Sequence, residues 1–260
     1  MTIQSTKIAI LAGGFGSRLG RETENLPKPL VEIGGSPILM HIMQHFCRAG
    51  LRDFVIALGY RGDCIKRYMM DYAQLHGDLR INLQSNQFER YGAQAPDWNV
   101  ELIETGLRTQ TGGRIRRLQP WLGDSRFILA WGDGLHNVDL GALLAFHAGH
   151  GRLATVVAVR PPARFGHLEF EGDRVVEFSE KPQAAEGWIN GGLFVLEPGV
   201  FACIDGDDTH WEHAPMRRLA AEGQLMAYRH EGFWQCMDTP RDLALLNRLW
   251  DAGSPPWQVV

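Results

Sequence analysis

The stretch KIAILAGGFGSRLG (residues 7–20) joins a short apolar run directly to a glycine-rich segment that carries an arginine. Residues 7–11 are predicted to form a buried strand. The glycines that follow let backbone amides approach a ligand closely, because they carry no Cβ. Arg18 adds a planar fork that suits phosphate oxygens. The stretch therefore predicts a phosphate-binding loop at the end of a strand.

Two common phosphate-binding loops do not fit this spacing. The dinucleotide fingerprint is G-x-G-x-x-G, and Gly14 and Gly16 supply its first two glycines, but Leu19 stands at the third and Gly20 comes one residue late. A P-loop requires a lysine directly after its last glycine, and none is present here. A nicotinamide-dependent dehydrogenase is therefore excluded on this pattern, and the glycines alone leave an ordinary surface turn open.

The composition limits the possible partners. The chain has 260 residues, 45% of them hydrophobic, and a formal net charge of −4, which argues against nucleic acid but not against a single nucleotide. No apolar run approaches the roughly 18 residues of a membrane span, and the polar residues 1–6 do not resemble a signal peptide. The four cysteines are scattered and form no C-x-x-C pair, which favours free thiols. We expect a cytoplasmic protein with neither a nucleic-acid nor a membrane partner.

Strands and helices alternate in the pattern. Residues 36–50 are predicted to form a helix with Ser36 as N-cap and Pro37 at the first helical position. Apolar runs at 53–60, 126–131 and 153–159 predict buried strands with helices between them, which indicates βαβ units. We therefore expect an α/β fold with a doubly wound, mostly parallel, Rossmann-like sheet.

The pattern changes from about residue 164, where short strands with polar breaks precede a closing helix at about 239–250. We expect a β-rich C-terminal portion within a single domain, residues 1–260, because no linker or repeat interrupts the chain.

The segments LAGGFGSRL and LPKPLVEIGGSPIL (residues 11–19 and 26–39) resemble the signature of the sugar-phosphate nucleotidyltransferases. The stretches TGGRIRRL, WGDGLHNVDL and GFWQCMDTPRD, which begin at Thr111, Trp131 and Gly232, narrow the resemblance to members that use CTP and glucose 1-phosphate. The resemblance implies Mg²⁺-dependent transfer of a cytidylyl group from CTP to α-D-glucose 1-phosphate, in a homo-oligomer, with a hexamer expected. It also implies a nucleotide-binding half at about 1–163 and a sugar-binding half at about 164–260. Another sugar 1-phosphate, dTTP or UTP in place of CTP, and a non-catalytic sugar-nucleotide sensor remain open alternatives.

The resemblance also assigns residues to roles. The nucleotide-binding residues would be Leu11, Ala12, Gly13, Gly14, Gly16, Ser17, Arg18, Lys28, Thr109, Thr111, Arg114 and Gly132. The catalytic residues would be Arg18, Lys28 and Asp133, the metal ligands Asp133 and Asp238, and the sugar-phosphate ligands Glu180, Lys181 and Asn190.

Elementary chemistry agrees with part of this assignment. The sugar phosphate is itself the nucleophile, so the site has to position two anions and neutralise their charge. Lys28 lies between Pro27 and Pro29, which stiffen its backbone, and Asp133 ends an apolar strand. Asp238 could instead cap the closing helix.

Other polar side chains are predicted to serve no chemistry. His41 and His45 lie four residues apart, but the H-E-x-x-H pattern is missing, so we expect a helix-surface or subunit-contact role. Cys236 stands where the resembled family commonly has proline, and a thiol is a poor ligand for Mg²⁺. Trp250 and Trp257 indicate a docked C-terminus.

Overall fold

The central sheet is built around the strand that begins the glycine-rich stretch. In the computed structural model, which describes residues 6–92, 95–161, 167–171, 174–179 and 187–258, β1 pairs in parallel with β4 and with β8. From edge to edge the seven strands are β14 (Leu225–His230), β10 (Ala154–Val159), β13 (Ile189–Leu196), β8 (Phe127–Trp131), β1 (Lys7–Leu11), β4 (Asp53–Leu58) and β7 (Asn99–Glu104). Only β13 runs antiparallel to its neighbours β8 and β10 in this sheet. The predicted mostly parallel α/β sheet is therefore confirmed.

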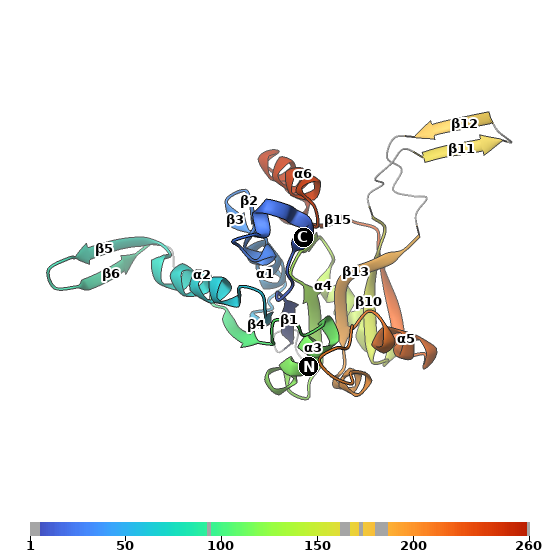
Figure 1. Cartoon of the computed structure of the whole chain (residues 1–260), viewed down its shortest axis with the longest axis horizontal. Coiled ribbons are helices and arrows are strands. Elements are labelled where there is room, and N and C mark those ends of the chain that lie inside the picture. The colour runs from blue at the N-terminus through green and yellow to red at the C-terminus, as the bar shows by residue number, and fades with distance from the viewer. Residues whose placement is uncertain (1–5, 93–94, 162–166, 172–173, 180–186, 259–260) are drawn as a thin grey trace.

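The helices cover both faces of the sheet (Figure 1). They are α1 (Ile38–Arg48), α2 (Gly62–Leu75), α3 (Thr111–Leu122), α4 (Leu140–His150), α5 (Ala214–Ala221) and α6 (Pro240–Asp251). Among the described residues, short strand pairs are β2 (Glu32–Ile33) with β3 (Ser36–Pro37), β5 (Asp78–Asn82) with β6 (Gln87–Tyr91), β9 (Gly134–His136) with β15 (Trp234–Cys236), and β11 (His167–Glu171) with β12 (Arg174–Ser179). The strands of the C-terminal half explain its β-rich pattern, and β13 and β14 belong to the same sheet as β1.

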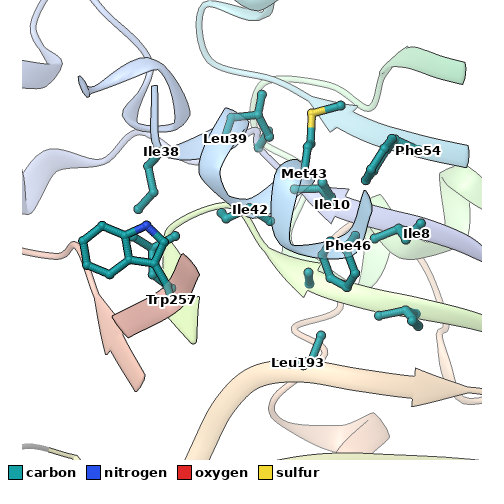
Figure 2. Close-up of a cluster of buried hydrophobic side chains, with 14 of the residues drawn as sticks. Ile8, Ile10, Ile38, Leu39, Ile42, Met43, Phe46, Phe54, Leu193 and Trp257 are labelled. Atoms are coloured by element: carbon teal, nitrogen blue, oxygen red, sulfur yellow. The ribbon is translucent and has the colours of Figure 1, made fainter. Parts of the chain in front are cut away.

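The alternation of side chains along β1 divides the core in two. Ile8 and Ile10 pack with apolar residues of α1, α4 and α6, whereas Ala9 packs with residues of α3 and α5 on the other face. Figure 2 shows the first of these cores, in which Ile8 and Ile10 lie beside Met43 and Phe46 of α1. Burial of both faces fixes β1 rigidly, because each side chain has a packed partner. The loop that follows β1 therefore starts from a fixed point.

The start of the first helix differs from the prediction. Ser36 and Pro37 form β3, which pairs with β2, and α1 begins only at Ile38 without a side-chain cap. Gly34 and Gly35 both have positive φ, at 59° and 77°, and they let the chain turn between β2 and β3. The Ser-Pro pair is thus used to complete a hairpin, so its interpretation as a helix start was wrong.

The prediction for the two α1 histidines was also wrong. His41 and His45 are both buried, and the Nε2 of His41 lies 2.9 Å from the Ile33 carbonyl oxygen. The ring of His41 packs edge-on against Trp250 and Trp257. The C-terminal segment covers this face of α1, so the tail is docked, as the tryptophans predicted.

The β5–β6 hairpin extends from the end of α2 away from the sheet, and all of its residues are exposed (Figure 1). Within the described parts of the chain, no helix combines the length and the apolar character that crossing a membrane would require.

Candidate active site

A cavity of about 590 Å³ opens at the carboxyl ends of β1 and β8. Parallel sheets commonly bind ligands at this edge. The glycine-rich loop forms one wall. The Gly132 amide donates to the Leu11 carbonyl at 3.0 Å and so joins the ends of the two strands. All twelve residues predicted to bind nucleotide line this cavity: Leu11, Ala12, Gly13, Gly14, Gly16, Ser17, Arg18, Lys28, Thr109, Thr111, Arg114 and Gly132.

The loop rests on a buried arginine. Arg114, from α3, is 5% exposed, and its guanidinium donates to the carbonyl oxygens of Leu58 at 2.9 Å and Gly13 at 3.0 Å and to the Thr105 hydroxyl at 2.7 Å. Burial lowers the pKa of Arg114. Its fork is therefore occupied by protein groups, and the predicted nucleotide-binding role of Arg114 would be to support the cavity wall.

The glycines of the loop have different reasons to be glycine. A Cβ on Gly13 would lie 2.5 Å from Cζ of Arg114, closer than real Cβ atoms come to other atoms. A Cβ on Gly14 would meet nothing within 4 Å, so this exposed position is open to a ligand. Gly59, which no sequence pattern singled out, has the same role as Gly13, because its Cβ would lie 2.5 Å from Nη1 of Arg114.

The far wall of this cavity comes from the segment before α3. The Thr111 hydroxyl donates to Oε2 of Glu212 at 2.6 Å and accepts from the Trp211 amide at 2.9 Å. Thr111 is therefore bound to the loop before α5. The cavity is also lined by residues that were not predicted from the sequence: Phe15, Pro29, Leu107, Arg108, Gln110 and Trp131. Arg108 and Gln110 alternate in the sequence with the predicted Thr109 and Thr111, and this adjacency could have identified them as lining residues.

Strand pairing brings the two predicted metal ligands together. Asp133 directly precedes β9 and Asp238 shortly follows β15, and these strands pair with Gly134 opposite Cys236. The Met237 amide continues the ladder by donating to the Asp133 carbonyl at 2.9 Å. Two aspartates far apart in the sequence thus meet beside the end of β8. The sequence alone contained no signal for this pairing.

Both carboxylates bind the ammonium group of Lys28. Its Nζ lies 2.6 Å from Oδ2 of Asp133 and 2.6 Å from Oδ1 of Asp238. The other oxygen of Asp238 lies 3.1 Å from Nη1 of Arg18. Burial lowers the pKa of Lys28, but the two carboxylates outweigh burial and raise it. Burial likewise raises the pKa of Asp238, and Lys28 and Arg18 outweigh it, so that pKa is lowered.

Asp238 does not cap the closing helix. Thr239 is the N-cap of α6, and its hydroxyl accepts from the Asp242 amide while the Asp242 carboxylate accepts from the Thr239 amide. This reciprocal capping box satisfies the first turn. The carboxylate of Asp238 therefore contacts Lys28 and Arg18 and does not cap the helix.

Cys236 is an unreactive neighbour of this cluster. Its Sγ lies 3.8 Å from Oδ2 of Asp238, so the thiol donates to that carboxylate. Burial, followed by the charges of Asp238 and Asp133, raises the pKa of Cys236 to about 12. The residue is consequently a neutral thiol at physiological pH.

A second cavity, of about 860 Å³, adjoins the first. Arg18, Trp131 and Asp133 line both cavities, so the two meet at the carboxylate cluster. Asn190 lines the second cavity, and its Oδ1 accepts from the Gly192 amide at 2.8 Å, which leaves the amide nitrogen as its donor. Glu180 and Lys181 lie outside the described residues. Trp234 and Arg241 also line this cavity and were not selected from the sequence.

The donor set fits a hard divalent cation. Mg²⁺ usually takes one or two carboxylates and completes its shell with waters and substrate phosphates. Asp133 and Asp238 both direct carboxylate oxygens at one small cationic group, beside a cavity large enough for a nucleotide. The residues present therefore fit Mg²⁺ held between protein and substrate.

Comparison with known proteins gives consistent matches. Residues 7–243 match the nucleotidyl transferase family. The chain is 45% identical to the glucose-1-phosphate cytidylyltransferase of Salmonella typhi, with 97% of this chain and 98% of the relative covered. It is 40% identical to the probable glucose-1-phosphate cytidylyltransferase of Bacillus subtilis, over 97% of this chain and 99% of that one. Among solved structures, HddC from Yersinia pseudotuberculosis has the same fold, with a TM-score of 0.70, 22% identity, and 94% of this chain and 99% of that one covered.

Proposed function

Because this chain belongs to the nucleotidyl transferase family, we propose that it transfers a cytidylyl group from CTP to α-D-glucose 1-phosphate. The products are CDP-glucose and pyrophosphate. Support comes from the glucose-1-phosphate cytidylyltransferase of Salmonella typhi and the probable one of Bacillus subtilis, which match the chain over nearly their full lengths. The whole chain would act as one nucleotidyltransferase domain, with the nucleotide held by residues of about 1–163 and the sugar by residues of about 164–260.

The observation that carries this proposal is the position of the charged cluster. Asp133, Asp238, Lys28 and Arg18 contact one another at the place where the two cavities meet. A transferase that joins two phosphate-bearing substrates needs two adjacent chambers and a charged group at their junction. A protein that only sensed a sugar nucleotide would use cations there for the diphosphate, but it would not need the carboxylate pair of Asp133 and Asp238 beside them.

The reaction needs no nucleophile from the protein. A phosphate oxygen of glucose 1-phosphate forms a bond to the α-phosphorus of CTP, while the bond from that phosphorus to the oxygen bridging to the β-phosphorus breaks. Pyrophosphate leaves with the electron pair of that bond. The protein must hold the two substrates in line and offset the charge of the transition state.

The cationic side chains would supply most of this stabilisation. Arg18 is exposed and lines both cavities, so its fork can bind phosphate oxygens of either substrate. Lys28 is held on a stiff backbone beside the nucleotide cavity. Asp133 and Asp238 would hold Mg²⁺, which when bound would neutralise charge on the phosphates.

Recognition of base and sugar would come from the outer walls. Thr109 and its neighbours Arg108 and Gln110 line the nucleotide cavity, and they would select cytosine over other bases. On the sugar side, Asn190 would donate its amide to a hydroxyl, as its oxygen is already bonded. Glu180 and Lys181 are proposed to complete that pocket.

The test is a matrix of pyrophosphate-release assays with CTP, dTTP and UTP against several hexose 1-phosphates, each with Mg²⁺. We expect release only with CTP and glucose 1-phosphate together, and CDP-glucose as the co-product. Release with another pair would change the substrate and keep the reaction class. If no pair gives pyrophosphate release, the result would contradict the proposed transferase activity and favour a sensor.

The assembly and location are part of the same proposal. The family resemblance implies a closed homo-oligomer, with a hexamer expected, and light scattering of the purified chain measures this directly. The four cysteines are free thiols, which fits the reducing cytoplasm.

A further inference from the structure

The ammonium of Lys28 occupies the position that a metal ion shared by Asp133 and Asp238 would need. Mg²⁺ binds carboxylate oxygens at about 2.0–2.1 Å. The two oxygens that face each other across the cluster, Oδ2 of Asp133 and Oδ1 of Asp238, each lie 2.6 Å from Nζ of Lys28. A metal ion in contact with both of these oxygens would overlap the ammonium, so the two cannot occupy the site together.

The remaining oxygen of Asp238 offers no alternative. It lies 3.1 Å from the Arg18 guanidinium and also accepts from the Cys236 thiol. The cluster therefore contains two carboxylates and two cationic side chains, and its formal charge is already balanced. Lys28, which is only 11% exposed, makes the tightest of these contacts. A free divalent ion would have to displace a bound cation and would leave excess positive charge in a half-buried site.

From this geometry we propose that Lys28 is a cation placeholder: it holds the Asp133–Asp238 pair in the free protein and releases it to a divalent ion only when nucleotide phosphates take up its ammonium. This inference rests on the proposed function, and it goes further by stating when the metal site becomes available. The consequence is that the divalent ion and the nucleotide bind cooperatively, since each removes the obstacle to the other.

The backbone around Lys28 confines the exchange to its side chain. Lys28 begins the short 3₁₀ helix η3 (Lys28–Leu30), and Pro27, Pro29 and Leu30 around it are buried. The two prolines fix φ on either side of the lysine. Lys28 also lines the nucleotide cavity, so rotation of its side chain alone can carry the ammonium from the carboxylates to a phosphate.

The experiment measures Mn²⁺ binding to the free protein by electron paramagnetic resonance, without any nucleotide. Lys28→Met removes the placeholder and leaves both carboxylates in place. We expect the variant to bind Mn²⁺ at least about fivefold more tightly than the wild-type protein, the lower end of usual coupling between two sites. Equal affinity in the two proteins, or weaker binding by the variant, would overturn the proposal.

A matched control removes a lysine elsewhere. Lys66 of α2 makes an ion pair at 2.6 Å with Glu104 at the end of β7, and β7 lies three strands away from β8 in the sheet, so Lys66→Met also deletes one ammonium from one ion pair. We expect its Mn²⁺ affinity to equal that of the wild-type protein. Tighter binding by Lys66→Met as well would attribute the effect to net charge and would contradict the placeholder.

The wild-type protein provides the test if Lys28→Met does not fold. We expect Mn²⁺ alone to leave its melting temperature unchanged, and Mn²⁺ with CTP to raise it above the value with CTP alone. A rise with Mn²⁺ alone as large as that with both ligands would overturn the proposal.

The two proposals fail in different ways. The Mn²⁺ titrations contain no nucleotide and no sugar, so they do not depend on the base or on turnover. Pyrophosphate release by the wild-type protein, together with an unchanged Mn²⁺ affinity in Lys28→Met, would support the reaction and contradict the placeholder role of Lys28. A changed affinity without release from any substrate pair would do the reverse.

Discussion

The clearest quantitative prediction concerns two adjacent glycines of the phosphate loop. Gly13→Ala and Gly14→Ala add the same methyl group one residue apart. At Gly13 the methyl carbon would lie 2.5 Å from Cζ of Arg114 and 3.0 Å from the Gly59 amide nitrogen, whereas at Gly14 it would meet nothing within 4 Å. We expect the first variant to be strongly destabilised and the second to be as stable as the wild-type protein.

The magnitude follows from the bonds of Arg114. The guanidinium cannot move aside freely, because it donates to the Leu58 and Gly13 carbonyls and to the Thr105 hydroxyl. A hydrogen bond to a charged group contributes about 1.5–3 kcal/mol, and loss of two of them gives roughly 3–6 kcal/mol for Gly13→Ala. Gly14→Ala should change the free energy of unfolding by no more than about 1 kcal/mol, since glycine is not required there.

The assay is urea unfolding followed by tryptophan fluorescence, combined with a double-mutant cycle. Arg114→Met removes the group that the new methyl would strike. In that background we expect Gly13→Ala to cost less than half of its value in the wild-type background. Equal costs in both backgrounds, or equal costs at Gly13 and Gly14, would refute the proposed support of the loop by Arg114.

Three further predictions concern the cluster. Asp133→Asn should lower kcat by at least about a hundredfold while the protein stays folded, since electrostatic groups at a transition state are commonly worth that much; the exposed Asp124→Asn should match the wild-type protein, and equal turnover in both variants would contradict the role of Asp133. The pKa of Asp238 is lowered by Lys28 and Arg18 against burial, so its contribution to stability is present above its ordinary pKa of 3.8 and is lost as pH falls through the lowered value. The pKa of Lys28 is raised above 10.5, so its contribution to stability is present below 10.5 and is lost as pH rises through the raised value. Because Asp238→Asn removes the acidic group, its free energy of unfolding should fall less steeply than that of the wild-type protein as the pH is lowered, and identical slopes would contradict the linkage. Because the pKa of Cys236 is raised to about 12, its alkylation at pH 8 should be roughly a thousandfold slower than that of a free thiol, measured by mass spectrometry; modification at the free-thiol rate would show that it is not buried beside the carboxylates.

The sequence was most informative where local pattern and fold agree. The apolar run of β1, the glycines after it and the aspartate after β8 all belong to continuous segments, so periodicity and turn chemistry predict them. The cavity they line contains every nucleotide-binding residue that the resemblance assigned.

The sequence was uninformative where distant segments meet. Ser36 looked like a helix cap, but pairing with Ile33 took precedence over that local preference. His41 looked exposed because nothing near it in the sequence showed that the C-terminal tail covers its face of α1. Similarly, the meeting of Asp133 and Asp238 depends on the pairing of β9 with β15, which no local pattern encodes.

The most direct measurement is anomalous diffraction from crystals of the protein with CTP and Mn²⁺. We expect an anomalous peak within bonding distance of carboxylate oxygens of both Asp133 and Asp238, with the Lys28 ammonium moved onto a phosphate. A peak on the phosphates alone, with Lys28 still between the two aspartates, would contradict it.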